Sequence, residues 1–417
     1  MSEIKDQRPR FSTSLKGNTS RRGPLSGVRV VDFTENMAGP FGTMILGDQG
    51  ADVVKVESPS GDVIRHSGSG SHAMASYFAN LNRSKRSLSI DLHRPESRPV
   101  LASLFDSADV VVHSFRPSAA RRLGLDVASV TKGRPHLIHA SIVGFGTTGP
   151  YAERPVYDHV IQALSGMADF QRANSHDDPH MVRHGVIDKS TGYVLAQSLC
   201  AALVQRFATG LGTNLEISML DVAVSLLWPD AMMDRTALKP ELRRPAVALT
   251  FRLTPTADGF VSLIVIKQAQ WDGLIAGLDM KGVTYEELGT TPSTSSMTPG
   301  EILSAARAVI ATLTSEEVVR RLSENDVPCA EVLTLDQMIV HPQIIANETL
   351  VEYDHPLIGP IRQPRAVPKF TSMSDVELVP APGLGNDSKE ILIELGLNGT
   401  TIDELIASGV VVVGRTT

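Results

Sequence analysis

The N-terminal half of the chain alternates between short Val-rich segments and segments with helical spacing, which limits the folds available to it. Residues 27–57 contain VRVVDF and ADVVKVE, which have strand character, on either side of GPFGTMILGDQG, which leads into a helix. A unit of this length favours parallel strands joined by a right-handed crossover. The pattern recurs in SKRSLSIDL, PESRPVLASLFDSA, DVVVHSF and HLIHASIVGFG. The sequence therefore predicts a doubly wound, Rossmann-like α/β domain.

The rest of the chain predicts a smaller domain and a return to the first. VYDHVIQALSGMADF and TGYVLAQSLCAALVQRFA each predict one helix, and the second is expected to end at the Gly210 and Gly212 pair. NLEISMLDVAVSLLW predicts a strand followed by a helix. TFRLTPTADGFVSLIVI predicts a β-hairpin that turns at Asp258-Gly259. We expect a disordered leader (1–23), a large α/β domain (24–228), a linker (229–244), a smaller α+β domain (245–330), and a second linker that returns to the large domain (331–417).

The composition is typical of a globular protein in a reducing compartment. Hydrophobic residues make up 42% of the chain and charged residues 20%, as in soluble folds. Cys200 and Cys329 lie far apart and form neither a disulfide framework nor a metal motif. No apolar run reaches the roughly 18 residues that a membrane helix needs. These features predict a cytoplasmic protein that does not enter a membrane.

The net charge of −7 argues against nucleic-acid binding, but the charge is unevenly distributed. The segment from residue 83 to residue 122 contains eight Lys or Arg and four Asp or Glu, which gives it a local net charge of +4. Such an excess is typical of a site for a small anionic ligand, and also of a solvated surface with ion pairs. The basic residues are Arg83, Lys85, Arg86, Arg94, Arg98, Arg116, Arg121 and Arg122.

The turn after the first predicted strand is not a dinucleotide-binding motif. Gly39 and Gly42 stand in G-P-F-G, which does not match G-x-G-x-x-G, and Pro40 removes a backbone N–H that a phosphate would need. Glu57 closes the second strand and is interpreted as a strand-end residue. The free N–H groups at the helix start remain able to hold a phosphate or a carboxylate. A Rossmann oxidoreductase is therefore only an alternative.

Several common catalytic and metal-binding motifs are missing. The sequence has no G-x-x-x-x-G-K-[ST], no H-E-x-x-H and no G-x-S-x-G. His176, His180 and His184 have the spacing of helical metal ligands, but NSHDDPH contains Pro179 and is typical of a loop. We therefore expect no metal site and no permanently bound cofactor.

Asp188 immediately precedes a long apolar helix pattern, in HGVIDKSTGYVLAQSLCAALVQRFATGLG. One interpretation is an N-cap, whose carboxylate accepts hydrogen bonds from the first free N–H groups. The other is a nucleophile, because a helix N-terminus favours the ionised carboxylate and stabilises charge during attack on a carbonyl. Such a nucleophile needs an acyl donor with a good leaving group, such as a thioester. The residues by themselves leave both interpretations open.

The block PLSGVRVVDFTENMAGPFGTMILGDQGADVVKVESPSGD resembles the opening of class III CoA-transferases, a family that includes formyl-CoA transferase, carnitine CoA-transferase and alpha-methylacyl-CoA racemase. RSKRSLSIDL, ADVVVHSFRPSAARRLGLD, HLIHASIVGFGTTGPYAERPVYDHVIQALSG and FATGLGTNLEISMLDV follow in the family's order. VPCAEVLTLDQMIVHPQ and NDSKEILIELGL extend the resemblance, which covers about residues 24–410.

The resemblance implies an enzyme that moves CoA from an acyl-CoA donor to a carboxylic acid acceptor. It places the family's nucleophilic aspartate on Asp188, in I-D-K-S-T-G. In the family this aspartate attacks acyl-CoA to give an anhydride, which the CoA thiolate converts to an aspartyl-CoA thioester. The acceptor carboxylate then collects the CoA. Tyr157 and Asp158 fall on supporting positions, and we expect Asp158 to act by hydrogen bonding.

The resemblance also implies contacts with CoA. Arg116 and Arg122 would meet the CoA phosphates through charge-assisted hydrogen bonds, with surface ion pairs as the alternative. The other implied contact positions are Asn36, Met37, Ser58, Ile90, Asp91, Leu92, His93, Ser114, Phe115, Val156, Tyr157 and Asp158.

Some positions depart from the family. Ser58 stands where formyl-CoA transferase has a phosphate-binding arginine, Pro155 replaces a family lysine, and RPAVALTFRLTPTADG has no glycine-rich flap. The resemblance therefore does not imply specificity for formyl-CoA or oxalate. The racemase branch has a histidine where this chain has Tyr157, and in a helix His159 would project elsewhere. A two-base racemase needs groups on both sides of the α-carbon.

The family's architecture is a homodimer of interlocked rings, and the resemblance implies the same for this chain. Pro-containing connections near residues 229–250 and 355–370 are compatible with the two linkers of that arrangement.

The main prediction from the sequence is a CoA-transferase that binds no nucleic acid. The alternatives are an acyl-CoA racemase or epimerase, a CoA-binding protein without turnover, and the Rossmann oxidoreductase.

Overall fold

The computed structural model describes residues 23–172, 176–284, 297–371 and 378–414, and the chain divides into two compact units. The first unit comprises Met1–Pro229 and Glu348–Thr417, and the second comprises Asp230–Asn347. The second unit begins earlier in the sequence and ends later than the small domain expected over 245–330. The expected leader lies outside the described residues except for Gly23.

The first unit is built on a large sheet, which within the described residues has seven strands in the order β12-β3-β2-β1-β4-β5-β6. Neighbouring strands from β3 to β6 are parallel, and β12 is antiparallel to β3. The strands are β1 (Arg29–Phe33), β2 (Asp52–Glu57), β3 (Lys85–Ile90), β4 (Val110–His113), β5 (Ile138–Val143), β6 (Asn214–Ser218) and β12 (Val411–Val412). The predicted α/β domain with a parallel sheet is confirmed.

Helices and one hairpin complete the first unit. The α-helices are α1 (Ala38–Asp48), α2 (Ser76–Asn82), α3 (Arg98–Ser107), α4 (Pro117–Leu123), α5 (Val127–Thr131), α6 (Asp158–Leu164), α7 (Met167–Phe170), α8 (Val186–Thr209), α9 (Met219–Leu227), α15 (Ser388–Glu394) and α16 (Gly399–Ala407). The 3-10 helices are η1 (Val63–His66) and η2 (Pro95–Ser97), and the antiparallel hairpin is β10 (Leu350–His355) with β11 (Gly359–Pro364).

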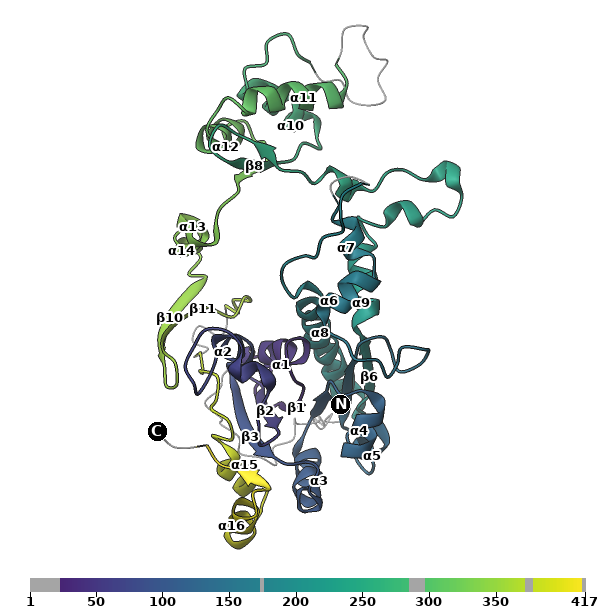
Figure 1. Cartoon of the computed structure of the whole chain (residues 1–417), viewed down its shortest axis with the longest axis vertical. Coiled ribbons are helices and arrows are strands. Elements are labelled where there is room, and N and C mark those ends of the chain that lie inside the picture. The colour runs from purple at the N-terminus through teal and green to yellow at the C-terminus, as the bar shows by residue number, and fades with distance from the viewer. Residues whose placement is uncertain (1–22, 173–175, 285–296, 372–377, 415–417) are drawn as a thin grey trace, which may run out of the picture. The chain divides into compact units, whose positions relative to one another are not determined.

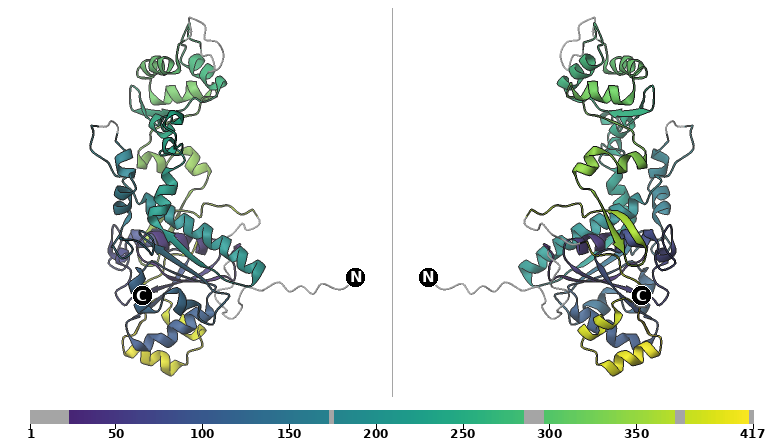
Figure 2. Two further views of the ribbon diagram at one scale, coloured as in Figure 1. Left: turned by 90° about the vertical axis from the view of Figure 1, so that its right-hand side faces the viewer. Right: turned by 90° about the vertical axis from the view of Figure 1, so that its left-hand side faces the viewer.

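Helices cover both faces of the sheet (Figure 1). On one face, alternate strand residues such as Val31, Val54 and Leu88 pack with α3, α15 and α16, although α3 is far from the other two in sequence. Figure 2 shows α15 and α16, in yellow, beside α3. The other face carries α1 and α8, which contact β1 and β2, and β5 and β6, respectively. The side chains of the central strands β1, β2, β3 and β4 therefore alternate between two buried layers.

Glycines determine where two of the helices end. The segment 156–170 was expected to form one helix, but Gly166 adopts φ 83° and separates α6 from α7. That expectation of continuity is therefore wrong, because a left-handed residue cannot continue a right-handed helix. α8 ends as predicted at Gly210, which has φ 74°. No helix in the described part of the chain is both long enough and apolar enough to cross a membrane.

The second unit has its own sheet and core. β7 and β8 form the predicted antiparallel hairpin, in which the Thr256 N–H donates to the Gly259 carbonyl at 2.9 Å. Trp271, Ile302 and Val318 lie in the core against this small sheet. The elements are β7 (Thr254–Pro255), β8 (Phe260–Leu263), β9 (Cys329–Glu331), α10 (Gln268–Gly277), α11 (Pro299–Ile310), α12 (Ser315–Ser323), α13 (Leu335–Ile339), α14 (Pro342–Ala346), η3 (Met233–Arg235), η4 (Pro240–Leu242) and η5 (Val247–Thr250).

Candidate active site

Asp188 lies in the first turn of α8 rather than before it. α8 begins at Val186, and the N-cap position is Gly185, which has no side chain to cap the helix. The interpretation of Asp188 as the N-cap is therefore wrong, because its carboxylate follows the first helical residues. At this third helical position the carboxylate still lies near the positive end of the helix dipole.

Asp158 supplies the hydrogen-bond acceptor that the start of α8 lacks. Its Oδ2 accepts hydrogen bonds from the backbone N–H groups of Ile187 at 2.8 Å and Asp188 at 2.9 Å. Its Oδ1 accepts a hydrogen bond from Gln162 Nε2 at 2.5 Å, and the residue is only 3% exposed. Because Asp158 is the first residue of α6, one buried carboxylate joins the starts of α6 and α8.

The Asp188 carboxyl has an unusual proton affinity. Burial, followed by the nearby negative charge of Asp158, raises the pKa of Asp188 from 3.8 to about 7. Its ionised form is therefore a better nucleophile than an ordinary aspartate at neutral pH. Strong perturbation by burial and a specific neighbouring charge is typical of functional carboxyls.

Two glycines bring α1 close to α8. A Cβ on Gly192 would lie 2.8 Å from the Ala38 carbonyl oxygen, and a Cβ on Gly42 would lie 2.8 Å from the Gly192 carbonyl oxygen. The helices can approach this closely only because both positions lack a side chain. Met37 Sδ, at the start of α1, lies 2.6 Å from the place that a Cβ on Gly185 would take. The loop before α1 therefore touches the start of α8.

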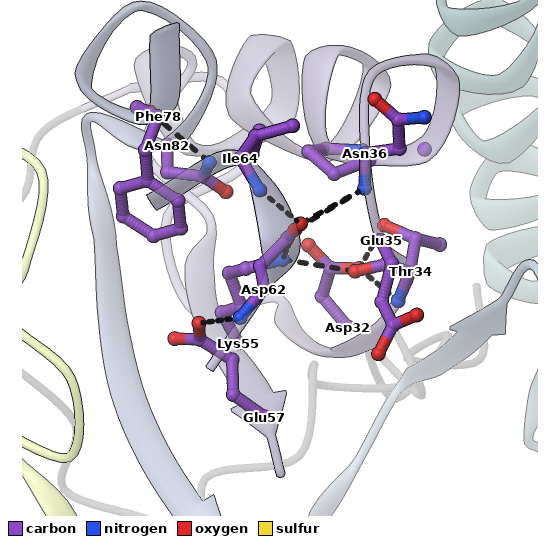
Figure 3. A network of polar contacts seen from close by, with 12 residues as sticks. Asp32, Thr34, Glu35, Asn36, Lys55, Glu57, Asp62, Ile64, Phe78 and Asn82 are labelled. Carbon is purple, nitrogen blue, oxygen red and sulfur yellow. Dashed lines mark hydrogen bonds and ion pairs between the residues drawn. The ribbon is translucent and has the colours of Figure 1, made fainter. Parts of the chain in front are cut away.

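Buried charged side chains hold the loop before α1 in place (Figure 3). Asn36 adopts φ 67°, and its backbone N–H donates to the two Asp62 carboxylate oxygens at 3.3 and 3.2 Å. Lys55 Nζ donates to the Thr34 carbonyl at 2.8 Å and to Asp62 Oδ2 at 3.0 Å. The left-handed turn at Asn36 is therefore fixed by one side chain from β2, Lys55, and one from the segment that follows it, Asp62.

The charges beneath the loop form a larger buried network near the carboxyl ends of β1 and β2. Lys85 Nζ lies 3.0 Å from Asp32 Oδ2, and Arg65 Nη2 lies 2.7 Å from Glu57 Oε1. Burial acts to raise the pKa of Asp32. The charges of Lys85 and Lys55, together with hydrogen bonds from Thr34 and Thr43, outweigh burial and hold this pKa at about 2. The network comprises Asp32, Lys55, Glu57, Asp62, Arg65 and Lys85, each at most 4% exposed. Its three carboxylates and three cations balance.

Tyr77, on α2, belongs to the same region and was missed in the sequence. Burial, and then the negative charges of Asp188, Asp158 and Asp62, raise the pKa of its hydroxyl. The Tyr77 hydroxyl is therefore close enough to interact electrostatically with both the candidate nucleophile and the buried network. Nothing in SYFANLN distinguishes this tyrosine from an ordinary helix aromatic, so only the packing of α2 could reveal it.

The predicted contacts after β1 and β4 come together. The Glu35 N–H, beside Asn36 and Met37, donates to Ser114 Oγ at 3.1 Å, which joins the loops after β1 and β4. The strand order reverses between these two strands, and ligands of parallel α/β sheets bind in the crevice at such a point. Phe115 is half-buried against the sheet core, and its N–H donates to His113 Nδ1 at 3.2 Å.

The predicted phosphate-binding arginines lie on the surface after β4. Arg116 is exposed and donates from Nη1 to the Glu153 carbonyl at 3.1 Å. Arg122 is exposed near the end of α4, and its carbonyl accepts a hydrogen bond from Arg98 Nη2 at 3.1 Å. Both guanidinium groups can therefore reach an anion in solvent.

The predicted contacts at the end of β3 differ in accessibility. Ile90 is fully buried in the core, so its side chain cannot meet a ligand. Asp91 Oδ1 accepts a hydrogen bond from the His93 N–H at 2.9 Å, and His93 is exposed. Ser58, exposed after β2, lies 2.9 Å from Ser60 through their hydroxyl oxygens.

The remaining predicted positions flank α6. Tyr157, the N-cap residue of α6, is 62% exposed. Val156 packs against Gly144, and a Cβ on Gly144 would lie 2.4 Å from Val156 Cγ1. A groove of about 1030 Å³ lies nearby, lined by residues of α6, α9 and the loop after β5, among them Tyr151, Leu164 and Trp228. Asp188 does not line this groove.

In the described residues, no group of three His, Cys, Asp or Glu could hold a metal ion.

Known proteins resemble this chain over nearly its whole length. It is 31% identical over 400 residues to the succinate–glutarate CoA-transferase of Agrobacterium fabrum, covering 90% of this chain and 96% of that protein. It is 30% identical over 387 residues to Rv3272, a probable fatty acyl-CoA transferase of Mycobacterium tuberculosis, covering 88% and 97%. A crystal structure of Rv3272 matches with a TM-score of 0.77 at 28% identity, covering 89% of this chain and all of that one.

A family model described as CoA-transferase family III matches residues 25–388. This range includes the whole second unit and, in the first unit, the loop at Asn36 and the start of α8. The chain therefore belongs to CoA-transferase family III, as its sequence predicted.

Proposed function

We propose that this enzyme transfers CoA from an acyl-CoA donor to a carboxylic acid through a covalent aspartyl-CoA thioester on Asp188. The observation that carries the proposal is the half-buried Asp188 carboxyl, whose backbone N–H is held by Asp158 and whose pKa is raised to about 7. A carboxylate that is poorly stabilised by its surroundings attacks a thioester more readily than a well-solvated one.

The proposed chemistry conserves every group and uses no water. An Asp188 oxygen attacks the donor thioester carbonyl, the C–S bond breaks, and CoA departs as its thiolate. The product on the enzyme is an acyl-aspartyl anhydride. The thiolate attacks the aspartyl carbonyl, which releases the donor acid as its carboxylate and leaves Asp188 as the CoA thioester. The acceptor carboxylate displaces the thiolate to form a second anhydride. Attack of the thiolate on the acceptor's carbonyl then gives the new acyl-CoA and restores Asp188.

The racemase and the CoA-binding protein without turnover find less support in the site. Tyr157 occupies the position at which a racemase of this resemblance would carry a histidine, and its side chain is largely solvent-exposed. A CoA-binding protein without turnover would have no need of a carboxyl whose pKa is raised to about 7. We therefore propose the transferase alone.

The CoA substrate would lie along the carboxyl ends of the parallel strands. Its pantetheine arm would enter beside Asn36, Met37 and Ser114, and Arg116 and Arg122 would bind its phosphates. The implied contact at Ile90 would involve only the backbone, because its side chain is in the core. Asp91 and His93 would lie at the rim of the site, and Phe115 would support it.

The relatives suggest two substrate classes for this chain. One is the pair of short dicarboxylates handled by the Agrobacterium enzyme, and the other is the fatty acyl-CoA named for the mycobacterial one. We propose a cytoplasmic, interlocked homodimer with a Rossmann-like large domain and no permanently bound cofactor, on the basis of the family resemblance. Light scattering of the purified protein tests the dimer, which a monomeric mass would contradict.

The experiment that tests the mechanism is mass spectrometry of the enzyme quenched during turnover. The wild type is expected to carry CoA, less one water, on the peptide that contains Asp188, with succinyl-CoA or a fatty acyl-CoA as donor. Asp188→Asn is expected to bind CoA but to form no adduct. Asp221→Asn is the matched control, because Asp221 is also the third residue of a helix, α9, but is exposed. An unmodified Asp188 peptide while product accumulates would contradict the proposal.

A further inference from the structure

The buried Lys55–Asp62 pair has contacts that go beyond holding the sheet together. Asp62 is 1% exposed and Lys55 is fully buried. Asp62 accepts hydrogen bonds from the backbone N–H groups of Asn36 and Ile64, while Lys55 donates to the Thr34 carbonyl. The pair therefore binds backbone atoms on both sides of the turn that follows β1, as Figure 3 shows.

The turn that this pair holds is the surface against which the start of α8 is packed. Asn36 adopts a backbone conformation, φ 67°, that is unfavourable for most residues, so the turn needs external support. The next residue, Met37, contacts Gly185 so closely that a Cβ there would lie 2.6 Å from its sulfur. The same Cβ would lie 3.7 Å from Asp158 Oδ2, the atom that receives the Asp188 N–H. A short chain of contacts thus leads from Asp62 to Asp188.

We propose that Lys55 and Asp62 are positioning residues, which fix Asn36 and Met37 and thereby set the place of the Asp188 carboxyl in the first turn of α8. The proposal rests on the proposed transfer of CoA through Asp188. Neither residue touches the substrate. A misplacement of the nucleophile by about 1 Å is enough to slow a reaction by about 100-fold.

A comparison of two double variants separates positioning from folding. Lys55→Met with Asp62→Asn removes both charges but keeps an oxygen that can accept the Asn36 N–H. Lys55→Met with Asp62→Leu removes the charges and the acceptor. Both replacements leave the buried region electrically balanced, and apolar substitution of a whole buried pair is often tolerated. We expect similar thermal stability for the two variants.

The expected difference lies in turnover. The Asn variant is expected to keep at least one third of the wild-type kcat, and the Leu variant to lose about 100-fold in kcat with less than a threefold change in KM for the acyl-CoA. Hydrogen exchange at the Asn36 amide is expected to be slow in the Asn variant and fast in the Leu variant. Equal kcat values for two folded variants would overturn the positioning proposal.

A matched pair at the other end of α1 serves as the control. Arg83 and Asp48 are also buried and lie 2.7 Å apart, at the C-terminal end of the helix. Arg83→Met with Asp48→Leu is expected to change kcat less than threefold. A loss of kcat as large as in the Lys55→Met, Asp62→Leu variant would overturn the proposal, because it would mean that any buried pair near α1 matters equally.

Two further outcomes are distinguishable. A wild-type enzyme that forms no adduct on Asp188 contradicts the proposed function, whereas the amide exchange of Asn36 still tests the positioning of the loop. Should the Leu variant not fold, Lys55→Met with Asp62→Ala replaces it. The Leu and Ala variants could both fail to fold while the Asn variant folds and is active. That result would show that the hydrogen-bond acceptor at position 62 is needed for folding itself, and it would overturn the proposal of a positioning role separate from folding.

Discussion

Asp188→Asn is expected to stabilise the protein at neutral pH while it abolishes transfer. The folded protein binds the Asp188 proton more tightly than the unfolded chain does, since the pKa rises from 3.8 to about 7 on folding. The free energy of unfolding therefore falls as the pH rises through this interval. The asparagine side chain cannot ionise, so the variant escapes this loss.

The expected gain follows from the size of the pKa change. A tenfold change in proton affinity corresponds to about 1.4 kcal/mol, so ionising Asp188 in the folded state costs about 4 kcal/mol. The substitution also removes a carboxylate from the first turn of α8, which costs up to about 1 kcal/mol through the helix dipole. Burial therefore outweighs the dipole, and the variant is expected to gain about 3 kcal/mol at pH 8 and nothing at pH 4.

Chemical denaturation at pH 4.5, 6, 7 and 8, at one protein concentration, measures this difference. The gap between Asp188→Asn and the wild type is expected to open with rising pH. Asp221→Asn, at the same helical position in α9 but exposed, is expected to show a small loss of stability at every pH. A pH-independent gap, or a less stable Asp188→Asn at pH 8, would refute the argument that Asp188 is ionised at a cost.

The remaining predictions concern the neighbours of Asp188. In Asp158→Asn the pKa of Asp188 is expected to fall. If ionised Asp188 is the nucleophile, as proposed, the rise of kcat with pH moves to lower pH, and an unmoved profile would exclude Asp158 as a cause. Arg122→Ala is expected to raise KM for the CoA substrate more than it lowers kcat, and an unchanged KM would leave Arg122 as a surface residue. Gly192→Ala is expected to cost about 2 kcal/mol in urea unfolding, since its Cβ would meet the α1 backbone. Gly300→Ala in α11, with open space around it, is expected to gain about 0.5 kcal/mol.

The sequence by itself determined the local elements and the family. Val-rich runs such as VRVVDF specify buried strands, and Gly210 specifies the end of α8, because strand and helix periodicity and left-handed turns depend on neighbouring residues. The blocks from residue 24 onward identified the family and drew attention to Asp188. The nearness of Asn36, Met37 and Ser114 depends instead on the order of the strands, with β1 beside β4, which the structure supplied.

Only the tertiary structure decided how Asp188 is held. The acceptor at the start of α8 is Asp158, which lies thirty residues away. The family resemblance predicted a supporting hydrogen bond from Asp158, but only the structure shows that its partners are the backbone N–H groups of Ile187 and Asp188. Tyr77 and the Lys55–Asp62 pair reach the site through the packing of α2, β2 and α1. Burial and charge proximity are properties of residues brought together from distant segments, so the raised pKa of Asp188 could not be derived from its neighbours in the chain.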